Sequence, residues 1–287
     1  MSRVDVRKTH KLFIGGAFPR SESGRTYEVT DSREQFLANM ALASRKDARD
    51  AVLAARSAVA KWSSATAYNR GQVLYRIAEV MEGRREQFIS EVSDSEGVSS
   101  RKAGAHVDAA IDRWVWYAGW ADKYAQVIGN TNPVAGPFFN FSVPEPTGVV
   151  AAVAPQDASV LGLVSVVAPI IVAGNAVIVM PSSSRPIPAI TLAECLATSD
   201  VPAGVVNILT GAPAEVMPWL AEHADVNALD LTGIVDEGVA ADLERSAAGT
   251  VKRVRGAAPH ADWQATPSLS RIRTFVEVKT VWHPMGV

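Results

Sequence analysis

The sequence predicts an α/β protein built on a Rossmann-like, doubly wound parallel sheet, with a mostly helical region before it and a further strand at its end. Three observations lead to this fold class. Short apolar segments alternate with helical ones between residues 147 and 254, amphipathic stripes fill much of residues 1–137, and 48% of the 287 residues are hydrophobic while 20% are charged. Such a chain can bury a large core. Its length suggests roughly two domains or one large α/β unit.

The first segment, residues 1–137, is predicted to begin with a hairpin-like turn at Lys11–Pro19 and to continue as helices. Apolar residues recur at intervals of three and four positions, which is the spacing of one helix face. These stripes are Val52, Ala55, Val59 and Trp62; Val73, Ile77 and Val80; and Val107, Ile111, Trp114, Ala118, Ala121, Ala125 and Ile128. The aromatic stretch Trp114–Trp120 has helical spacing, so we expect it in the core and not in a ligand cage.

Residues 138–146 predict an exposed strand, because Phe139, Phe141 and Val143 alternate with polar side chains. We expect the strand to end at Pro144 and Pro146, since proline lacks the donor that a sheet needs.

Residues 147–254 predict the core of the sheet. The expected strands are Gly148–Ala154, Ala176–Met180, Val205–Thr210, Ala228–Thr232 and Val251–Val254. The expected helices lie near Val160–Ala173, Ala189–Ser199, Pro213–His223 and Asp236–Ala247. This alternation is typical of a parallel sheet with helices on both faces, which binds its ligand at the carboxyl ends of the strands.

A stretch of 27 residues without charge, Ala158–Ser184, raises the question of a membrane span. Pro169 and the pair Gly174-Asn175 are expected to interrupt it, and the residues after the break read as a strand. We therefore predict a buried helix–turn–strand unit. The charged start of the chain, MSRVDVRKTHK, lacks the apolar centre of a signal peptide, and we expect a cytoplasmic protein with no membrane partner.

The chain is predicted to close with a 14-residue linker, residues 255–268, and a final segment, residues 269–287, that contains a strand. In that strand Val276, Val278, Thr280 and Trp282 share one face, and Phe275, Glu277, Lys279 and Val281 share the other. An apolar strand at this place needs a partner, either its own sheet or another subunit.

Composition excludes several classes of function. The 28 basic and 30 acidic residues nearly cancel, so no charge excess favours nucleic acid. One cysteine, Cys195, rules out an internal disulfide and lies in an apolar helix, where it is expected to be a small core residue. The histidines at 106, 223, 260 and 283 have no ligand spacing, so we expect no metal.

The strand-to-helix turns contain neither a GxGxxG nor a Walker A motif. Gly233 and Gly238 could frame a pyrophosphate, although a glycine at such a junction is more often structural. The pair Asp236-Glu237 is better explained as the acidic start of a helix than as an acid/base pair.

These turns carry a resemblance to a known family. GVVAAVAPQDAS, AGNAVIVMPSSSRP, PAGVVNILTGAPAEV, LTGIVDEG and VKRV resemble the coenzyme-binding half of the aldehyde dehydrogenase superfamily. IGGAFPRSESGRTYEV and WYAGWADK are similar to its amino-terminal region, and FVEVKTVWH is similar to its final strand. The resemblance runs in register over almost the whole chain and implies the fold predicted above.

The resemblance also implies that the family's functional residues are replaced. Its catalytic asparagine falls on Asp157, whose carboxylate would repel an oxyanion, and the neighbouring tryptophan falls on Gln156. The lysine on the adenosine ribose falls on Met180, and the acidic residue beyond it falls on Ser183. A serine of the phosphate turn falls on Ile234.

The catalytic domain is expected to be absent. After Val254 the family places its general base, but this chain has Arg255-Gly256-Ala257-Ala258-Pro259, and the linker stands where the domain with the nucleophilic cysteine belongs. No catalytic residue is therefore expected. We expect no cofactor, with NAD as the doubtful exception, and only a vestigial cleft at Pro155, Gln156, Asp157, Met180, Ser182, Gly211, Thr232, Gly233 and Gly238.

In the family, strands equivalent to residues 138–146 and 269–287 build inter-subunit sheets, so we predict both as oligomerisation segments. The expected interface residues are Phe139, Phe141, Val143, Val276, Val278 and Trp282. The chain resembles the degenerate second module of tandem aldehyde dehydrogenases, and the leading hypothesis is a pseudoenzyme subunit that scaffolds or regulates an active aldehyde dehydrogenase. The alternatives are an NAD-binding sensor and a self-associating homo-oligomer. Aldehyde oxidation by this chain alone lacks a nucleophile and a base.

Overall fold

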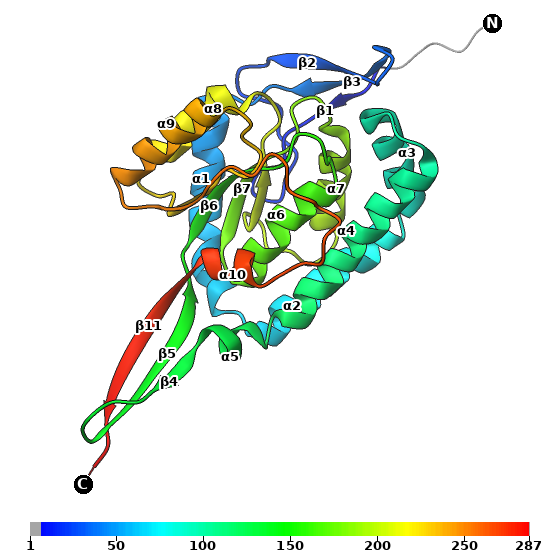
Figure 1. Cartoon of the computed structure of the whole chain (residues 1–287). Coiled ribbons are helices and arrows are strands. Elements are labelled where there is room, and N and C mark those ends of the chain that lie inside the picture. Colours follow the sequence, from blue (N-terminus) through cyan, green and yellow to red (C-terminus); the bar gives the residue numbers. More distant parts are fainter. Residues whose placement is uncertain (1–6, 287) are drawn as a thin grey trace, which may run out of the picture.

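The computed structural model describes residues 7–286; residues 1–6 and 287, which belong to the first and last predicted segments, lie outside it. Its centre is a five-stranded parallel sheet in the order β10-β9-β6-β7-β8 (Figure 1). The strands are β6 (Val149–Val153), β7 (Ala176–Met180), β8 (Val206–Ile208), β9 (Ala228–Asp230) and β10 (Arg253–Arg255). Chain order runs outward from β6 in both directions, as in a doubly wound sheet, so the predicted fold class is confirmed.

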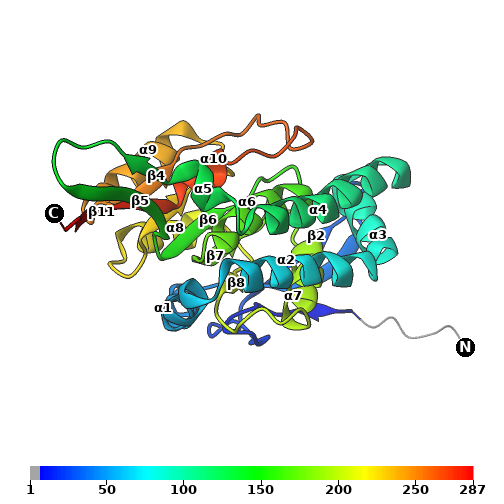
Figure 2. The same ribbon diagram turned by 90° about the horizontal axis from the view of Figure 1, so that it is seen from below.

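Helices cover both faces of this sheet (Figures 1 and 2). Alternate residues of β6 belong to different cores: Val150 and Ala152 pack on one side, while Val149, Ala151 and Val153 pack on the other. The first core contains α6 (Leu161–Val172) and α7 (Ile187–Ala197), and the second contains α8 (Pro213–Glu222) and α9 (Glu237–Ala248). Because both of their faces are buried, β6 and β7 are apolar throughout and not alternating.

The amino-terminal helices pack around this centre. They are α1 (Arg45–Ser64), α2 (Ala67–Glu82), α3 (Arg85–Glu96), α4 (Ser100–Trp120) and α5 (Tyr124–Ile128). A capping box starts α1, in which the side chain of Ser44 accepts from the backbone of Asp47 and the Asp47 carboxylate accepts from the backbone of Ser44. Trp114 and Tyr117 on α4 are fully buried, so the aromatic stretch contributes to the core as predicted.

Two predictions for this region were wrong. The apolar stripe to Ile128 is not one helix, because α4 ends at Trp120 and a turn precedes α5. The residues after Pro19 are also not helical, since β2 (Thr26–Thr30) and β3 (Phe36–Ala41) form a small sheet with β1 (Thr9–His10). β2 and β3 form an irregular antiparallel pair with a register shift at Val29/Thr30, and the two-residue strand β1 pairs in parallel with β3 across β2 in the sequence. Such short and irregular strands leave only a weak local pattern.

The uncharged stretch forms α6, a turn and β7, as predicted. Pro169, however, lies inside α6 and does not end it; the turn comes at Gly174, whose φ of +94° favours glycine. Every residue of α6 is buried. Among residues 7–286, no helix has the length and apolar character that crossing a membrane requires.

The expected fifth strand is shifted. Residues 253–255 form β10, so Arg255 belongs to the sheet and not to the linker. Val251, predicted as its first residue, is 90% exposed with a positive φ and lies in the preceding turn.

A three-stranded antiparallel sheet projects from the body of the protein (Figure 1). This arm consists of β4 (Asn130–Asn132), β5 (Phe138–Pro146) and β11 (Val276–Pro284), in the order β11-β5-β4, and α10 (Ser270–Thr274) precedes its last strand. β5 and β11 pair over nine residues. Pro144 and Pro146 lie within β5 and do not end it, because β4 stops opposite Ser142 and leaves that side of the strand open.

Asn175 joins the arm to the sheet. Its side chain is fully buried; its Nδ2 donates to the carbonyls of Ile170 (3.1 Å) and Phe275 (2.8 Å), and its Oδ1 accepts from the backbone of Gly148 (2.8 Å). One amide thus holds the end of α6, the start of β6 and the start of β11.

We predict that Asn175→Ala lowers the free energy of unfolding by about 3 kcal/mol, because the backbone N–H of Gly148 loses its buried acceptor and the carbonyls of Ile170 and Phe275 each lose one donor. Urea unfolding measures the change. Asn69→Ala, at an exposed position of α2, is the matched control and should stay within about 0.5 kcal/mol of the original chain. A loss at Asn175 as small as the control's would contradict the assignment.

Candidate functional site

The candidate ligand site lies at the carboxyl edge of the parallel sheet, between β6 and β9. These two strands are neighbours in the sheet, but the chain leaves β6 toward β7 and leaves β9 toward β10, in opposite directions. The point at which the connections diverge is the usual ligand-binding place of a doubly wound fold. A pocket of about 330 Å³, here called the switch-point pocket, opens there. Its lining comprises Pro155, Gln156, Asp157, Ser184, Arg185, Thr232, Gly233, Val235, Ala258, Pro259 and His260. Five of the predicted cleft residues thus come together.

The Gln156 side chain bridges two of the turns at this edge. Its Nε2 donates to the Ala154 carbonyl (2.8 Å), and its Oε1 accepts from the backbone of Ser183 (2.9 Å). The Gln156 carbonyl in turn accepts from Ser182 Oγ (2.8 Å). Polar groups that a ligand would otherwise meet at the ends of β6 and β7 are therefore already paired with each other.

The other predicted cleft residues do not line this pocket. Met180 and Ser182 are buried beneath it, with at most 1% of their surface exposed. Gly211 follows β8, where its carbonyl accepts from Ser183 Oγ (3.0 Å), and Gly238 is exposed in the first turn of α9. The predicted cleft residues therefore lie at the same edge of the sheet, but they do not all line one cavity.

Gly233 has a structural role. A Cβ at this position would lie 2.0 Å from the Ala154 carbonyl oxygen, and its N–H donates to the Val153 carbonyl (2.9 Å). The turns after β6 and β9 therefore approach so closely that no side chain fits. The acidic residue that follows is a helix cap, as predicted, because Asp236 Oδ1 accepts from the backbone of Val239 (3.0 Å).

The linker covers the sheet edge. The backbone of Ala258 donates to the Thr232 carbonyl, and farther along Arg113 of α4 donates to the carbonyls of Trp263 (2.8 Å) and Ala265 (3.1 Å). The other nitrogen of the same guanidinium donates to Ser165 of α6 (2.9 Å). The linker is therefore part of the packed structure, although its sequence indicated only a connection.

A buried ion pair fastens the segment after the linker. Asp230, the last residue of β9, is fully buried and lies 3.0 Å from Arg271 of α10. Thr232 donates its hydroxyl to the same carboxylate and accepts from Arg271 (3.3 Å), and the guanidinium lies 5.0 Å from the ring centroid of Trp263. Sequence reasoning missed this cluster; an acidic residue ending an apolar strand was the only available signal.

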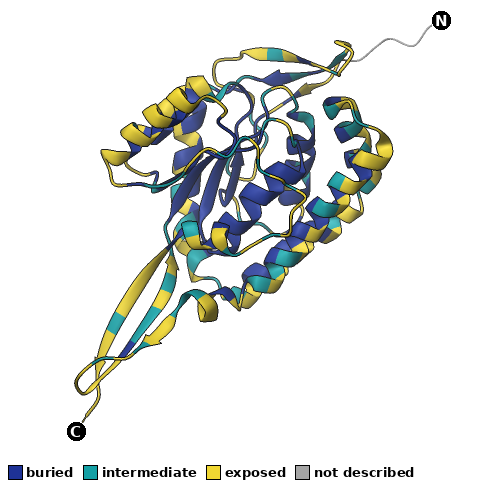
Figure 3. Cartoon of the chain, viewed as in Figure 1, coloured by how far each residue is buried: buried dark blue, intermediate teal, exposed yellow. Residues whose placement is uncertain are grey.

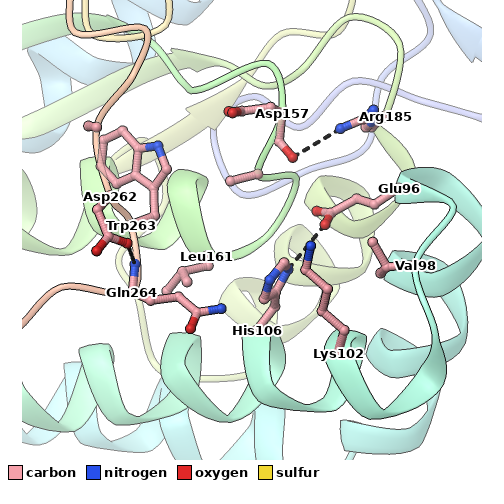
Figure 4. A pocket seen from close by; sticks show the side chains of 12 residues that line it. Glu96, Val98, Lys102, His106, Asp157, Leu161, Arg185, Asp262, Trp263 and Gln264 are labelled. Carbon is pink, nitrogen blue, oxygen red and sulfur yellow. Dashed lines mark hydrogen bonds and ion pairs between the residues drawn. The ribbon is translucent and has the colours of Figure 1, made fainter.

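A second pocket of about 370 Å³, here called the linker pocket, lies beside the first and shares Asp157 and Arg185 with it (Figure 4). Its wall contains a partly buried pair in which His106 Nδ1 lies 3.1 Å from Glu96 Oε2. Glu96 Oε1 accepts from the backbone (2.8 Å) and hydroxyl (2.7 Å) of Ser159. No cluster of three metal-ligating side chains occurs within residues 7–286.

Cys195 lies in the core, as predicted. Its side chain is fully buried in α7, and burial raises the pKa of the thiol to about 12. The thiolate, which is the nucleophilic form, is therefore strongly disfavoured near neutral pH.

We predict that Asp230→Asn lowers the free energy of unfolding by about 3 kcal/mol, because it leaves the buried Arg271 without its counter-charge. Asp242→Asn is the control, since Asp242 pairs with Arg245 on the surface, where both side chains are more than 70% exposed. Urea titration of both variants makes the comparison; equal losses would show that burial does not matter here.

We also expect Cys195 to resist iodoacetamide at pH 8 in the folded protein and to react once guanidinium unfolds the chain, because burial suppresses the thiolate. Mass spectrometry of the alkylated chain gives the measurement, with N-acetylcysteine as the reactive control. Rapid alkylation of the folded protein would be inconsistent with a core thiol.

The chain is similar in sequence and fold to known proteins. Residues 18–256 match the aldehyde dehydrogenase family. The chain is 32% identical to cytosolic 10-formyltetrahydrofolate dehydrogenase of Pongo abelii over 246 residues, which is 83% of this chain but 27% of that protein. It is 31% identical to the aldehyde dehydrogenase, cytosolic 1, of Elephantulus edwardii, over 88% of this chain and 51% of the relative.

A solved structure of an aldehyde dehydrogenase from Bacillus cereus in complex with NAD+ superposes with a TM-score of 0.81 at 26% identity, covering 86% of this chain and 50% of that one. The chain thus spans about half of the aldehyde dehydrogenases that it matches, and a smaller part of the formyltetrahydrofolate enzymes. With the doubly wound sheet and the family match over most of its length, this chain belongs to the aldehyde dehydrogenase family.

Proposed function

We propose that the protein is a non-catalytic, aldehyde-dehydrogenase-like subunit that assembles with an active aldehyde dehydrogenase and scaffolds or regulates it. The observation that carries the proposal is the projecting arm, whose strands expose large apolar side chains. Most of the arm is exposed or half-buried, whereas the parallel sheet is buried (Figure 3).

The register of the arm places apolar groups on both of its faces. Asn140 pairs with Trp282 and Pro144 pairs with Val278, and residues directly opposite each other share a face. Trp282 and Val278 therefore lie on the face opposite to Phe139, Phe141 and Val143. The predicted interface set is split between two surfaces, one with Phe139 45% exposed and one with Trp282 57% exposed.

One member of the predicted set is not available to a partner. Val276 is 2% exposed and packs into the core with α6 and α10, where β11 leaves the body of the protein. Its place in the interface prediction was wrong, because the first residue of β11 is still buried in the body of the protein, whereas the following residues are exposed or half-buried.

An arm of this kind favours a partner. Most of the arm is two-stranded, because β4 pairs with only three residues of β5, and a two-stranded ribbon is at best marginally stable in water. Exposed apolar side chains on a strand also favour pairing with another chain. Contacts within the arm, such as Phe138 against Trp282 with centroids 5.7 Å apart, cover only part of this surface.

The site chemistry supports a role without catalysis by this chain. The family's oxyanion donor falls on Asp157, an exposed carboxylate. The family's general base falls within the linker segment that covers the sheet edge, and Cys195 is buried in α7.

The residues of the cleft do not fit NAD. Met180, at the position of the family's ribose-binding lysine, is a buried apolar side chain, and Ile234 offers no hydroxyl at the phosphate turn. Both the nitrogen and the oxygen of the Gln156 side-chain amide form hydrogen bonds with the protein backbone. Losing several hydrogen bonds at roughly 1 kcal/mol each weakens binding by orders of magnitude, so an NAD sensor is the weaker alternative.

A homo-oligomer through the same arm is the second alternative, since symmetric pairing of identical chains is common. A cytoplasmic location belongs to the proposal and agrees with the word cytosolic in the names of two relatives.

The proposal is tested by native mass spectrometry of the protein purified from its own cell. We expect a particle that contains a longer aldehyde dehydrogenase chain, identified by its mass. Trp282→Asp and Phe139→Asp should release this chain by placing a charge in the apolar contact, while Tyr68→Asp on α2, 66% exposed, should not.

A particle containing only this chain would favour the homo-oligomer, and a monomer would end the assembly proposal. NADH formation from aldehydes by the isolated chain would contradict a non-catalytic role. If the arm variants dissociate the particle and its aldehyde dehydrogenase activity falls, the result would support regulation or scaffolding.

A further inference from the structure

A third pocket, of about 340 Å³, lies at the end of the small amino-terminal sheet, where β1 and β3 finish and β2 begins (Figure 1). We call it the amino-terminal pocket. It shares no residue with the two pockets at the edge of the parallel sheet. Its lining comprises Thr9, His10, Lys11, Arg20, Ser21, Glu22, Gly24, Arg25, Thr26 and Ala41. Its volume lies at the lower end of the range of small-molecule pockets.

His10 is the buried polar group of this pocket, with 6% of its surface exposed. Its ring forms no hydrogen bond within residues 7–286, and its nitrogens are not fully enclosed by the protein. Burial, and then the charge of Lys8, lowers the pKa of His10 to about 4, so the ring is neutral near pH 7 and carries one N–H donor. Since buried polar groups in proteins are normally paired, this donor is a candidate partner for a ligand.

Two exposed cations lie next to each other in the pocket wall. The backbone N–H of Leu12 donates to the Pro19 carbonyl (3.0 Å), and a bridge nearer the turn has the same register, so Lys11 lies opposite Arg20. Neither cation forms an ion pair with another residue of the described chain, 7–286. Like charges opposite each other on paired strands repel, and an anion bound between them relieves this repulsion.

The other charges of the wall are already paired. Arg25 lies 2.8 Å from Glu215, and Glu22 lies 2.6 Å from Lys46. The pocket therefore keeps an excess of positive charge, which comes from the two unpaired cations.

The loop after Arg20 is fixed by hydrogen bonds to a buried carboxylate. Asp47 accepts from the hydroxyl of Ser21 (2.8 Å) and from the backbone of Glu22 (2.9 Å). The wall that carries Arg20 is thus in place before a ligand binds, which lowers the entropy cost of binding.

This set of groups favours an anion with more than one charge. Two cations and an imidazole N–H offer donors of three different kinds. A carboxylate has one charge and two oxygens, whereas the phosphate group of a monoester carries close to two charges near neutral pH and has three free oxygens. Guanidinium and ammonium groups are common phosphate ligands in proteins.

We propose that the amino-terminal pocket binds the phosphate group of a small molecule. Lys11 and Arg20 supply the counter-charge, and the His10 ring donates a hydrogen bond to a phosphate oxygen. The site uses no residue of the arm, so it is separate from the assembly proposed above.

Isothermal titration of the whole purified chain tests the site, with inorganic phosphate and glycerol 3-phosphate as probes and sodium chloride keeping the ionic strength constant. We expect saturable binding of at least one phosphate probe and at least about fivefold weaker binding of acetate, which carries one charge. The tighter of the two phosphate probes shows whether the free ion or a phosphate ester is the better ligand.

Variants locate the binding. Lys11→Gln and Arg20→Gln should each weaken phosphate binding by about fivefold, since each removes one partly exposed charge from the site. Lys61→Gln and Arg33→Gln, at exposed positions outside the pocket, are the charge-matched controls and should bind as the original chain does. Circular dichroism and Tm verify that all four variants are folded.

Nuclear magnetic resonance of the histidine rings gives a readout in the unchanged chain. Signals of the His10 ring should shift as the tighter phosphate probe is added, whereas those of His260, exposed in the linker, should not.

Absence of saturable binding of both phosphate probes to the folded chain overturns the proposal. Acetate binding as tight as that of the phosphate probes also overturns it, because the two cations would then not select a doubly charged group. Unchanged affinity in both Lys11→Gln and Arg20→Gln, or a His10 ring that does not respond to a saturating probe, would place the phosphate elsewhere and has the same consequence.

Discussion

The buried ion pair between Asp230 and Arg271 joins the parallel sheet to the segment that follows the linker. Asp230 ends β9, the neighbour of the central strand β6, and Arg271 lies in the short helix α10 before the last strand. The carboxylate is completely buried, so separation of the pair leaves an uncompensated charge in the protein interior. The path of the linker and the starting point of the arm both depend on this contact.

The linker packs over the carboxyl edge of the parallel sheet and forms part of the surface there. Arg113 holds two of its carbonyls, and Trp263 packs against the guanidinium of Arg271. Residues of the linker then form walls of both pockets at the carboxyl ends of the strands. A stretch that reads as a simple connection therefore determines the shape and the charge of the candidate site.

The arm and the parallel sheet differ in how far their faces are buried. The central strands β6 and β7 of the parallel sheet are buried on both faces and are apolar without alternation. The arm exposes both faces, yet it keeps aromatic and branched residues on each. Asn175 holds the two together, because its amide reaches α6, β6 and β11 at once. The proposed subunit contact uses the surface that the chain itself leaves uncovered.

The sequence by itself determined the doubly wound core, because short apolar segments alternate with helices whose regular apolar stripes show directly which residues are buried. It also placed the turns after β6, β7, β8 and β9 at one edge, and it identified Cys195 as a core residue. It did not reveal the short and irregular strands β1, β2 and β3, nor the break between α4 and α5. Only the tertiary structure decided that Val276 is buried, that the linker closes over the sheet and that Asp157, Arg185, Lys102 and Asp262 share a cavity. Periodicity reports which face of an element is buried, whereas these features depend on which elements meet in space.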